Sequence, residues 1–214
     1  VTFAEKSNKK EDSYWLENRP VPLTEEETSN YVKKDSVYKV RNSQVYLDSV
    51  DAISNRFKLT KIITGYTFNN SFKEKRFNYQ GLFNLSSFNF NTVQGYHIGS
   101  GFSYSSYNEE KQKRTSITSD FQYGFSDKRL RPTAGFYHKF NNTNDAFIRL
   151  AGGNKVNQFN SSEPISGIVN SVSSLVFKNN FMKLYEKEFI EIGTGRELAN
   201  GLFLNANLAY ENRK

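Results

Sequence analysis

The chain has 214 residues, of which only 36% are hydrophobic, while aromatic residues reach 15% with 19 Phe and 13 Tyr. A soluble α/β protein draws its apolar residues mainly from Leu, Val, Ile and Ala, and a disordered chain is poor in aromatics. The composition argues against both and favours many-stranded β structure. The absence of cysteine excludes a disulfide framework, thiol catalysis and Cys-ligated metal sites.

The charge divides the chain into two parts. Residues 1–60 contain 10 basic and 10 acidic residues, so the net charge of +7 belongs to residues 61–214. We therefore predict an extended and helical lead-in or plug segment over 1–60, and a separate body over 61–214. The basic residues of the body are spread over connectors and strand ends, which favours solvated loops, contact with acidic lipid head groups or an anion-attracting lumen over nucleic-acid binding.

Helix signals dominate the first part. Pro20 and Pro22 predict an extended segment, and Thr24 to Glu27 form a capping box, which predicts a helix over about 25–37. A second helix is predicted to run to about Asn55. Its loose apolar stripe should dock on a neighbouring element or plug one end of the body; the stripe comprises Val45, Leu47, Val50 and Ile53.

From Lys61 onward the hydrophobic pattern has a period of two. The clearest alternating segments are 94–107, 115–126, 131–141 and 202–210. Each places Phe, Tyr, Leu or Ile on one face and Asn, Gln, Ser, Thr, Gly or charged residues on the other. Such segments, joined by short polar connectors, predict an antiparallel up-and-down transmembrane β-barrel with apolar residues outward and polar residues inward. A soluble β-sandwich is the alternative, but it would have to expose the polar face.

Between about residues 165 and 186 the period slips. Ile168, Val172, Leu175, Val176 and Met182 suggest helical spacing, although the aromatic and β-branched content leaves a strand possible. Of the two interpretations we favour an amphipathic helix inside or beside the barrel.

The search for catalytic motifs identifies no site. The two histidines, His97 and His138, lie on different predicted strands and lack the spacing of metal ligands. A Gly-x-Ser-x-Gly elbow is absent from the sequence. We therefore predict no catalytic, cofactor-binding or metal-binding residue and no cofactor, and we expect the protein not to be an enzyme. A hydrolase that uses His97 or His138 with a serine on the barrel wall is the least favoured alternative.

Three segments resemble one family. The first runs from Tyr14 to Thr24, the second contains Asn91-Thr92-Val93-Gln94-Gly95-Tyr96, and the third pairs residues 182–187 with 196–202. Together they are similar to a Bacteroidetes-type family of outer-membrane β-barrels of unknown function, which often carries an N-terminal carboxypeptidase-regulatory-like domain. Gln94 stands where that family usually has an acidic residue.

The resemblance implies an outer-membrane location, and a barrel related to TonB-dependent receptors of which residues 61–214 form a fragment. The leading expectation is a non-enzymatic barrel in transport, surface binding or envelope assembly. The alternative is a structural subunit of a larger envelope complex, in which residues 1–60 contact a periplasmic or other envelope partner. Outer-membrane lipid is the other expected partner, and nucleic acid is not one.

Overall fold

The computed structural model describes the chain except residues 1–11, 19–20, 83–87, 110, 141–142 and 161. Pro20 of the predicted extended segment therefore lies outside the described residues. The described helices are α1 (Asp12–Asn18), α2 (Glu25–Arg41), α3 (Gln44–Ser54), α4 (Lys61–Thr64) and α5 (Gly167–Val176). The strands are β1 (Tyr66–Asn70), β2 (Lys75–Tyr79), β3 (Asn89–Asn91), β4 (Gly95–Asn108), β5 (Lys113–Gly124), β6 (Leu130–Lys139), β7 (Phe147–Gln158), β8 (Leu184–Ala199) and β9 (Leu202–Arg213).

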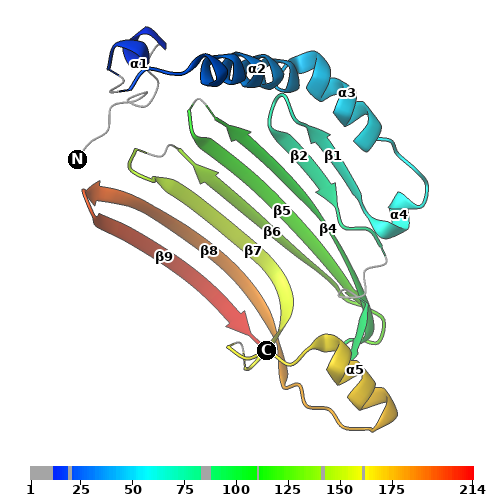
Figure 1. Ribbon diagram of the computed structural model, residues 1–214. Coiled ribbons are helices and arrows are strands. Elements are labelled where there is room, and N and C mark those ends of the chain that lie inside the picture. The colour runs from blue at the N-terminus through cyan, green and yellow to red at the C-terminus, as the bar shows by residue number, and fades with distance from the viewer. Residues whose placement is uncertain (1–11, 19–20, 83–87, 110, 141–142, 161) are drawn as a thin grey trace.

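The strands form one antiparallel sheet of nine strands (Figure 1). Its order, β1-β2-β4-β5-β6-β7-β8-β9, is that of an up-and-down meander, with β3 paired to β4 beside this path. The predicted mostly-β antiparallel fold and the helical N-terminal segment are confirmed. The sheet is not closed into a barrel, because β1 and β9 remain its two edges. Eight strands in sequence are the smallest number seen in closed membrane barrels, and β1 and β2, with five residues each, are short for such a wall.

The strand register separates the side chains into two faces. One row of directly paired residues crosses all eight strands of the meander and is apolar at every position: Phe68, Phe77, Tyr104, Ile117, Phe136, Leu150, Ile192 and Leu208. The adjacent row on the other side of the sheet is Asn69, Arg76, Ser105, Ser116, Tyr137, Arg149, Gly193 and Asn207. We call these two sides the apolar face and the polar face.

In a soluble protein the apolar face of a sheet is buried and the polar face is exposed. In this sheet the pattern of burial is the opposite one. On the apolar face, side chains such as Phe77 and Leu208 are 37% and 73% exposed. Along β8 the polar-face residues Lys187, Phe189 and Gly193 are buried, whereas the apolar-face residue Ile190 is exposed. Along β8 the polar face is therefore the packed one and the apolar face is the open one.

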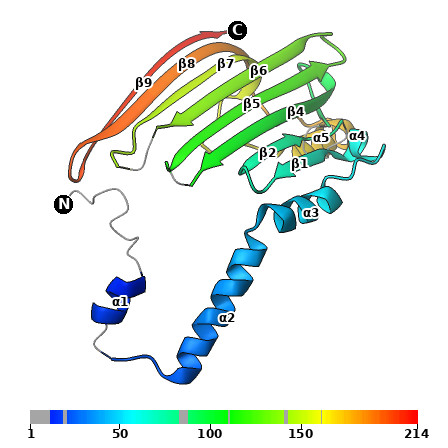
Figure 2. The same cartoon turned by 90° about the horizontal axis from the view of Figure 1, so that it is seen from above.

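The two ends of the sheet carry different connections. The turn end has the connections 71–74, 109–112, 140–146 and 200–201, whereas the cover end has the longer connections 80–94 and 159–183 together with the short turn 125–129. Helix α3 lies against β1 at the turn end, and α5 contacts β3 at the cover end (Figures 1 and 2).

The predicted capping box of α2 is present: the Thr24 N–H donates to Glu27 Oε2 at 2.9 Å, and the Glu27 N–H donates to Thr24 Oγ1 at 3.2 Å. This helix continues four residues beyond the predicted end, to Arg41. Helix α3 also forms, and it docks on a neighbouring element, one of the two predicted outcomes.

Most of the predicted apolar stripe of α3 does not make this contact, because Val45, Val50 and Ile53 are exposed and Leu47 alone is half-buried. Buried Asp51 instead accepts hydrogen bonds from the Ser71 N–H at 2.6 Å and the Ser71 hydroxyl at 2.7 Å. Asn55 exchanges two hydrogen bonds with the backbone of Asn69. A carboxylate that accepts two hydrogen bonds holds the helix against the β1–β2 turn more specifically than an apolar stripe does.

The interpretation of residues 165–186 as a helix holds for 167–176, after which β8 begins at Leu184. The helix packs by its polar side. Asn170 is completely buried and accepts from the N–H groups of Phe181 and Met182, while Ile168, Val172 and Val176 are exposed.

The backbone conformation of Gly153 can be tested by substitution. Its φ of +139° lies in a region that side-chain-bearing residues rarely adopt, and an added Cβ would lie 2.2 Å from the Pro132 carbonyl oxygen. We expect Gly153→Ala to lower the free energy of unfolding by about 2 kcal/mol or more, measured by urea unfolding in detergent. The control is Gly152→Ala, where the nearest atom to the added Cβ is 3.2 Å away. Equal losses of unfolding free energy in Gly153→Ala and Gly152→Ala would contradict the conclusion that the backbone conformation at position 153 requires glycine.

Candidate functional site

The β6–β7 ladder stops before either strand ends. Strand β6 begins at Leu130, but its pairing with β7 starts only at Thr133, opposite Gly153. Pro132 has no N–H to donate, and Gly153 turns the backbone of β7 away by its positive φ. Beyond this point β7 continues, paired with β8 alone. The two strands therefore separate towards the cover end, and side chains fill the space between them.

An ion cluster occupies this gap. Arg131, only 2% exposed, donates from Nε to Glu186 Oε1 at 3.1 Å and from Nη2 to Asp127. Glu186 also accepts from Arg129 Nη1 at 2.9 Å and from Asn154 Nδ2 at 2.9 Å. The β5–β6 turn, β6, β7 and β8 thus meet through two arginines, two carboxylates and the amide of Asn154. Because the buried guanidinium is paired with both carboxylates, its charge is compensated.

Asp127 belongs to the turn between β5 and β6. Burial alone would raise the pKa of its carboxyl, but the hydrogen bond from Arg131, the Arg129 N–H and the charges of both arginines outweigh burial and lower that pKa. A lowered folded-state pKa stabilises the fold above the unfolded value of about 4. That stabilisation is lost as the pH falls through the folded-state pKa.

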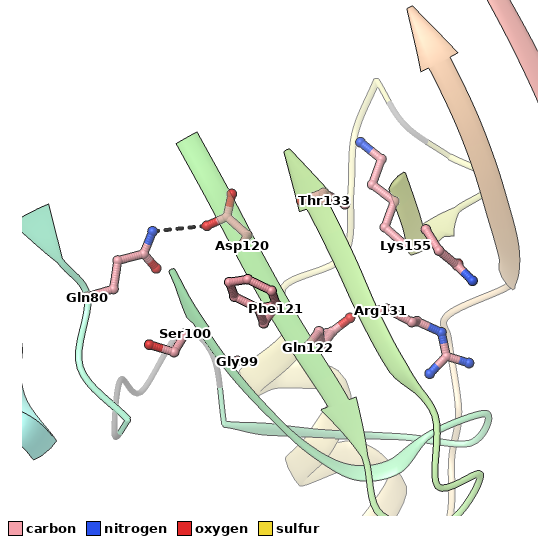
Figure 3. Close-up of a pocket in the computed structure, with 10 residues that line it drawn as sticks. Gln80, Gly99, Ser100, Asp120, Phe121, Gln122, Arg131, Thr133 and Lys155 are labelled. Atoms are coloured by element: carbon pink, nitrogen blue, oxygen red, sulfur yellow. Dashed lines mark hydrogen bonds between the residues drawn. The ribbon is translucent and has the colours of Figure 1, made fainter. Parts of the chain in front are cut away.

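A polar hollow of about 260 Å³ adjoins the cluster (Figure 3). Arg131 and Asn154 reach it from the gap, and Asp120, Gln122 and Lys155 line it from β5 and β7. Gln80 donates to Asp120 Oδ1 at 3.1 Å across its far side. The lining therefore carries carboxylate, amide, guanidinium and ammonium groups, which suit a polar or charged ligand and not an apolar one.

The motif Asn91-Thr92-Val93-Gln94-Gly95 forms the tight turn from β3 into β4. Asn91 Oδ1 accepts from the N–H groups of Val93 at 3.0 Å and Gln94 at 2.7 Å, and Gly95 has a φ of +66°. Gln94 is 1% exposed, and its Oε1 accepts from Asn91 Nδ2 at 2.9 Å. The motif thus builds a turn beneath α5, where a neutral amide avoids the penalty of burying an acidic side chain.

The two histidines lie on opposite faces of the sheet. His97 is buried on the polar face, with Nδ1 3.3 Å from Asn91 Nδ2. His138 is on the apolar face, with Nδ1 2.9 Å from Thr115 Oγ1 and its ring against Phe136 and Phe140. The structure does not bring them together. No group of three His, Cys, Asp or Glu side chains that could hold a metal ion occurs in the described ranges.

The sequence reasoning missed the residues of the cluster. It treated the basic residues as solvated connectors, whereas Arg131 is buried. A charged residue directly before Pro132, at the start of an alternating strand, is the signal that could have pointed to it, because proline interrupts a ladder. Glu186 lies in a segment that carried the family resemblance, yet its arginine partners are 55 and 57 residues away in sequence.

Comparison with known proteins identifies a family and no function. A family model described as "Family of unknown function (DUF5686) C-terminal domain" matches residues 60–214. Neither the curated proteins nor the solved structures contain a match. Among the helices that the structure describes, none has the length and apolar character needed to cross a membrane.

The contacts of the ion cluster allow a prediction of how substituting Glu186 changes the stability of the fold. We expect Glu186→Gln to lower the free energy of unfolding by about 3 kcal/mol, because it removes one of two charges that compensate buried Arg131. Urea unfolding in detergent measures this. Glu188→Gln, two residues along the strand and paired with exposed Lys214, is the matched control and should change stability much less. Similar losses in both variants would show that the cluster is not a structural centre.

Proposed function

The chain belongs to this family of unknown function, and from that premise we propose that it forms a wall of an outer-membrane β-barrel, without enzymatic activity, that serves transport, surface binding or envelope assembly. The observation that carries the proposal is the unbroken apolar row across eight strands, from Phe68 to Leu208, next to a predominantly polar row. Lipid can cover such an apolar face without a desolvation cost, whereas exposing that face to water is unfavourable.

Strand length and helix α5 also support this proposal. Strands β4 to β9 have 10 to 16 residues, and a tilted membrane-spanning strand needs about 9–11. Helix α5 has exposed Ile168, Val172 and Val176 at the cover end of the sheet. An apolar helix surface at a sheet end is suited to the lipid interface.

The connections suggest an orientation. Bacterial outer-membrane barrels have short periplasmic turns and longer outer loops. By this rule the turn end faces the periplasm and the cover end, with α5, faces outward. Residues 1–60 would then form a periplasmic lead-in, since α3 is attached at the turn end. Residues 61–214 would form part of a larger barrel, whose further strands pair with the open edges.

A second candidate function is that of a subunit in a larger envelope complex. Helix α2 projects away from the sheet (Figure 2), has no buried residue and exposes Tyr38 and Val40. The element packed against it in the described chain is α3. A free helix at the periplasmic end is suited to contact a periplasmic protein partner.

The membrane proposal predicts opposite outcomes for two neighbouring residues of β9. We expect Leu208→Arg, on the apolar face, to lower stability in lipid by about 2–4 kcal/mol, and Asn207→Arg, on the polar face, to have little effect. The full-length gene product is folded into phosphatidylcholine vesicles, and insertion is read by protection from protease. If both variants insert as well as the parent, or the parent folds without lipid, the proposal is wrong.

The subunit proposal is tested by deleting residues 1–42, which leaves α3 and its Asp51 contact in place. We expect the deletion to abolish crosslinks between the turn end and periplasmic proteins, while membrane insertion persists. Crosslinks are identified by mass spectrometry after reaction in intact cells. An unchanged crosslink pattern would rule out a role for α2 in partner binding.

A further inference from the structure

Three buried polar atoms beside the hollow have no hydrogen-bond partner among the described residues. They are Arg131 Nη1, a donor, Asn154 Oδ1, an acceptor, and the Ser100 hydroxyl, which can donate or accept. The Arg131 side chain is 99% buried and its other donors are used by Glu186 and Asp127. All three residues line the hollow. A buried polar group without a partner is destabilising, so a ligand that accepts from Arg131 and donates to Asn154 would be stabilised there.

Two charged groups of the hollow also lack a counter-ion within the described ranges. Lys155 Nζ lies 4.9 Å from the centre of the Phe189 ring and forms no ion pair with a described residue. Asp120 accepts a hydrogen bond from the neutral amide of Gln80. Figure 3 shows Asp120 on one side of the hollow and Lys155 and Arg131 on the other. The hollow therefore has an acceptor side and a donor side.

From this arrangement we propose that the hollow binds a small zwitterion, with its carboxylate at Arg131 and Lys155, its ammonium at Asp120 and a further N–H donor at Asn154. A simple anion would leave Asp120 without a counter-ion, and a simple cation would leave Lys155 without one. An uncharged polyol would meet both charges with hydroxyl groups only, which form weaker hydrogen bonds than charged groups.

The register sets the size of the ligand. Asp120 pairs with Thr133, and Gln122 pairs with Arg131 two positions along the same two strands. Two residues of a strand span about 7 Å, which is also the length of an extended dipeptide. The volume of about 260 Å³ lies just below the range of pockets for drug-sized ligands. A dipeptide with free termini is therefore the class of zwitterion that fits. This inference goes beyond the proposed function, because one face of the sheet forms the hollow whatever covers the other face.

The test uses the full chain in detergent micelles and isothermal titration calorimetry with alanyl-alanine. We expect saturable binding that weakens at least about tenfold in Lys155→Met and in Asp120→Asn. Lys155→Met keeps an unbranched side chain against Phe189, so packing there is maintained. Arg76→Met, which removes a cation from the same face outside the hollow, is the control and should leave the affinity unchanged.

Two blocked probes test the unaltered chain, so the result does not depend on variants that fold poorly. N-acetyl-alanyl-alanine lacks the ammonium and alanyl-alanine amide lacks the carboxylate, and each should bind at least about tenfold more weakly. The proposal is overturned if alanyl-alanine does not bind, if a blocked probe binds equally well, or if the two substitutions have no effect. Preferential binding of a neutral disaccharide would also overturn it. None of these outcomes changes the vesicle insertion test, which contains no ligand.

Discussion

The antiparallel ladder is the constraint on which the rest of this structure depends. Because paired residues in adjacent strands point to the same side, each apolar residue in the register extends one face across the whole meander. Phe68 and Leu208 are 140 positions apart and still share a row. A shift of one residue at any strand would send that strand's aromatic and aliphatic side chains among Arg149, Asn207 and the other polar residues. The row is therefore evidence for one register and for an environment that differs between the two faces.

The site arises where that ladder is interrupted. Pro132 cannot donate, and Gly153 adopts a backbone conformation that leads β7 away from β6. The gap would leave backbone groups without partners, and the structure fills it with charged and amide side chains. The same two residues thus end the regular pairing and create the space for Arg131. Stability and binding are linked here, since the carboxylates that compensate Arg131 occupy its Nε and Nη2 donors and leave Nη1 beside the hollow.

Much of the fold could be predicted from the sequence, because the signals were local. Period-two alternation located β4, β5, β6 and β9, and the capping box located α2. Closure and docking depend on contacts that are distant in sequence, and these were not predictable from a pattern. The pattern could not predict that β1 and β9 remain open edges. It also could not predict that Asp51, and not the apolar stripe, holds α3 against the sheet. The candidate site was missed for the same reason, since Arg131 on β6 and Glu186 on β8 come together only because β7 pairs with both strands.

Helix α5, at the cover end, has a polar side and an apolar side that are arranged like the two faces of the sheet. A helix with an exposed apolar side and a buried Asn170 would be unfavourable in water, because burying the apolar side would release more free energy. Its orientation follows from what it covers. The polar face below it has Gln94 and His97, which require hydrogen-bonding neighbours, and Ser171 bonds to the backbone of Phe90. The helix therefore continues the arrangement of the sheet, with polar groups towards β3 and the polar face and apolar groups away from them. One environment that accepts the apolar face of the strands would accept α5 in the same orientation.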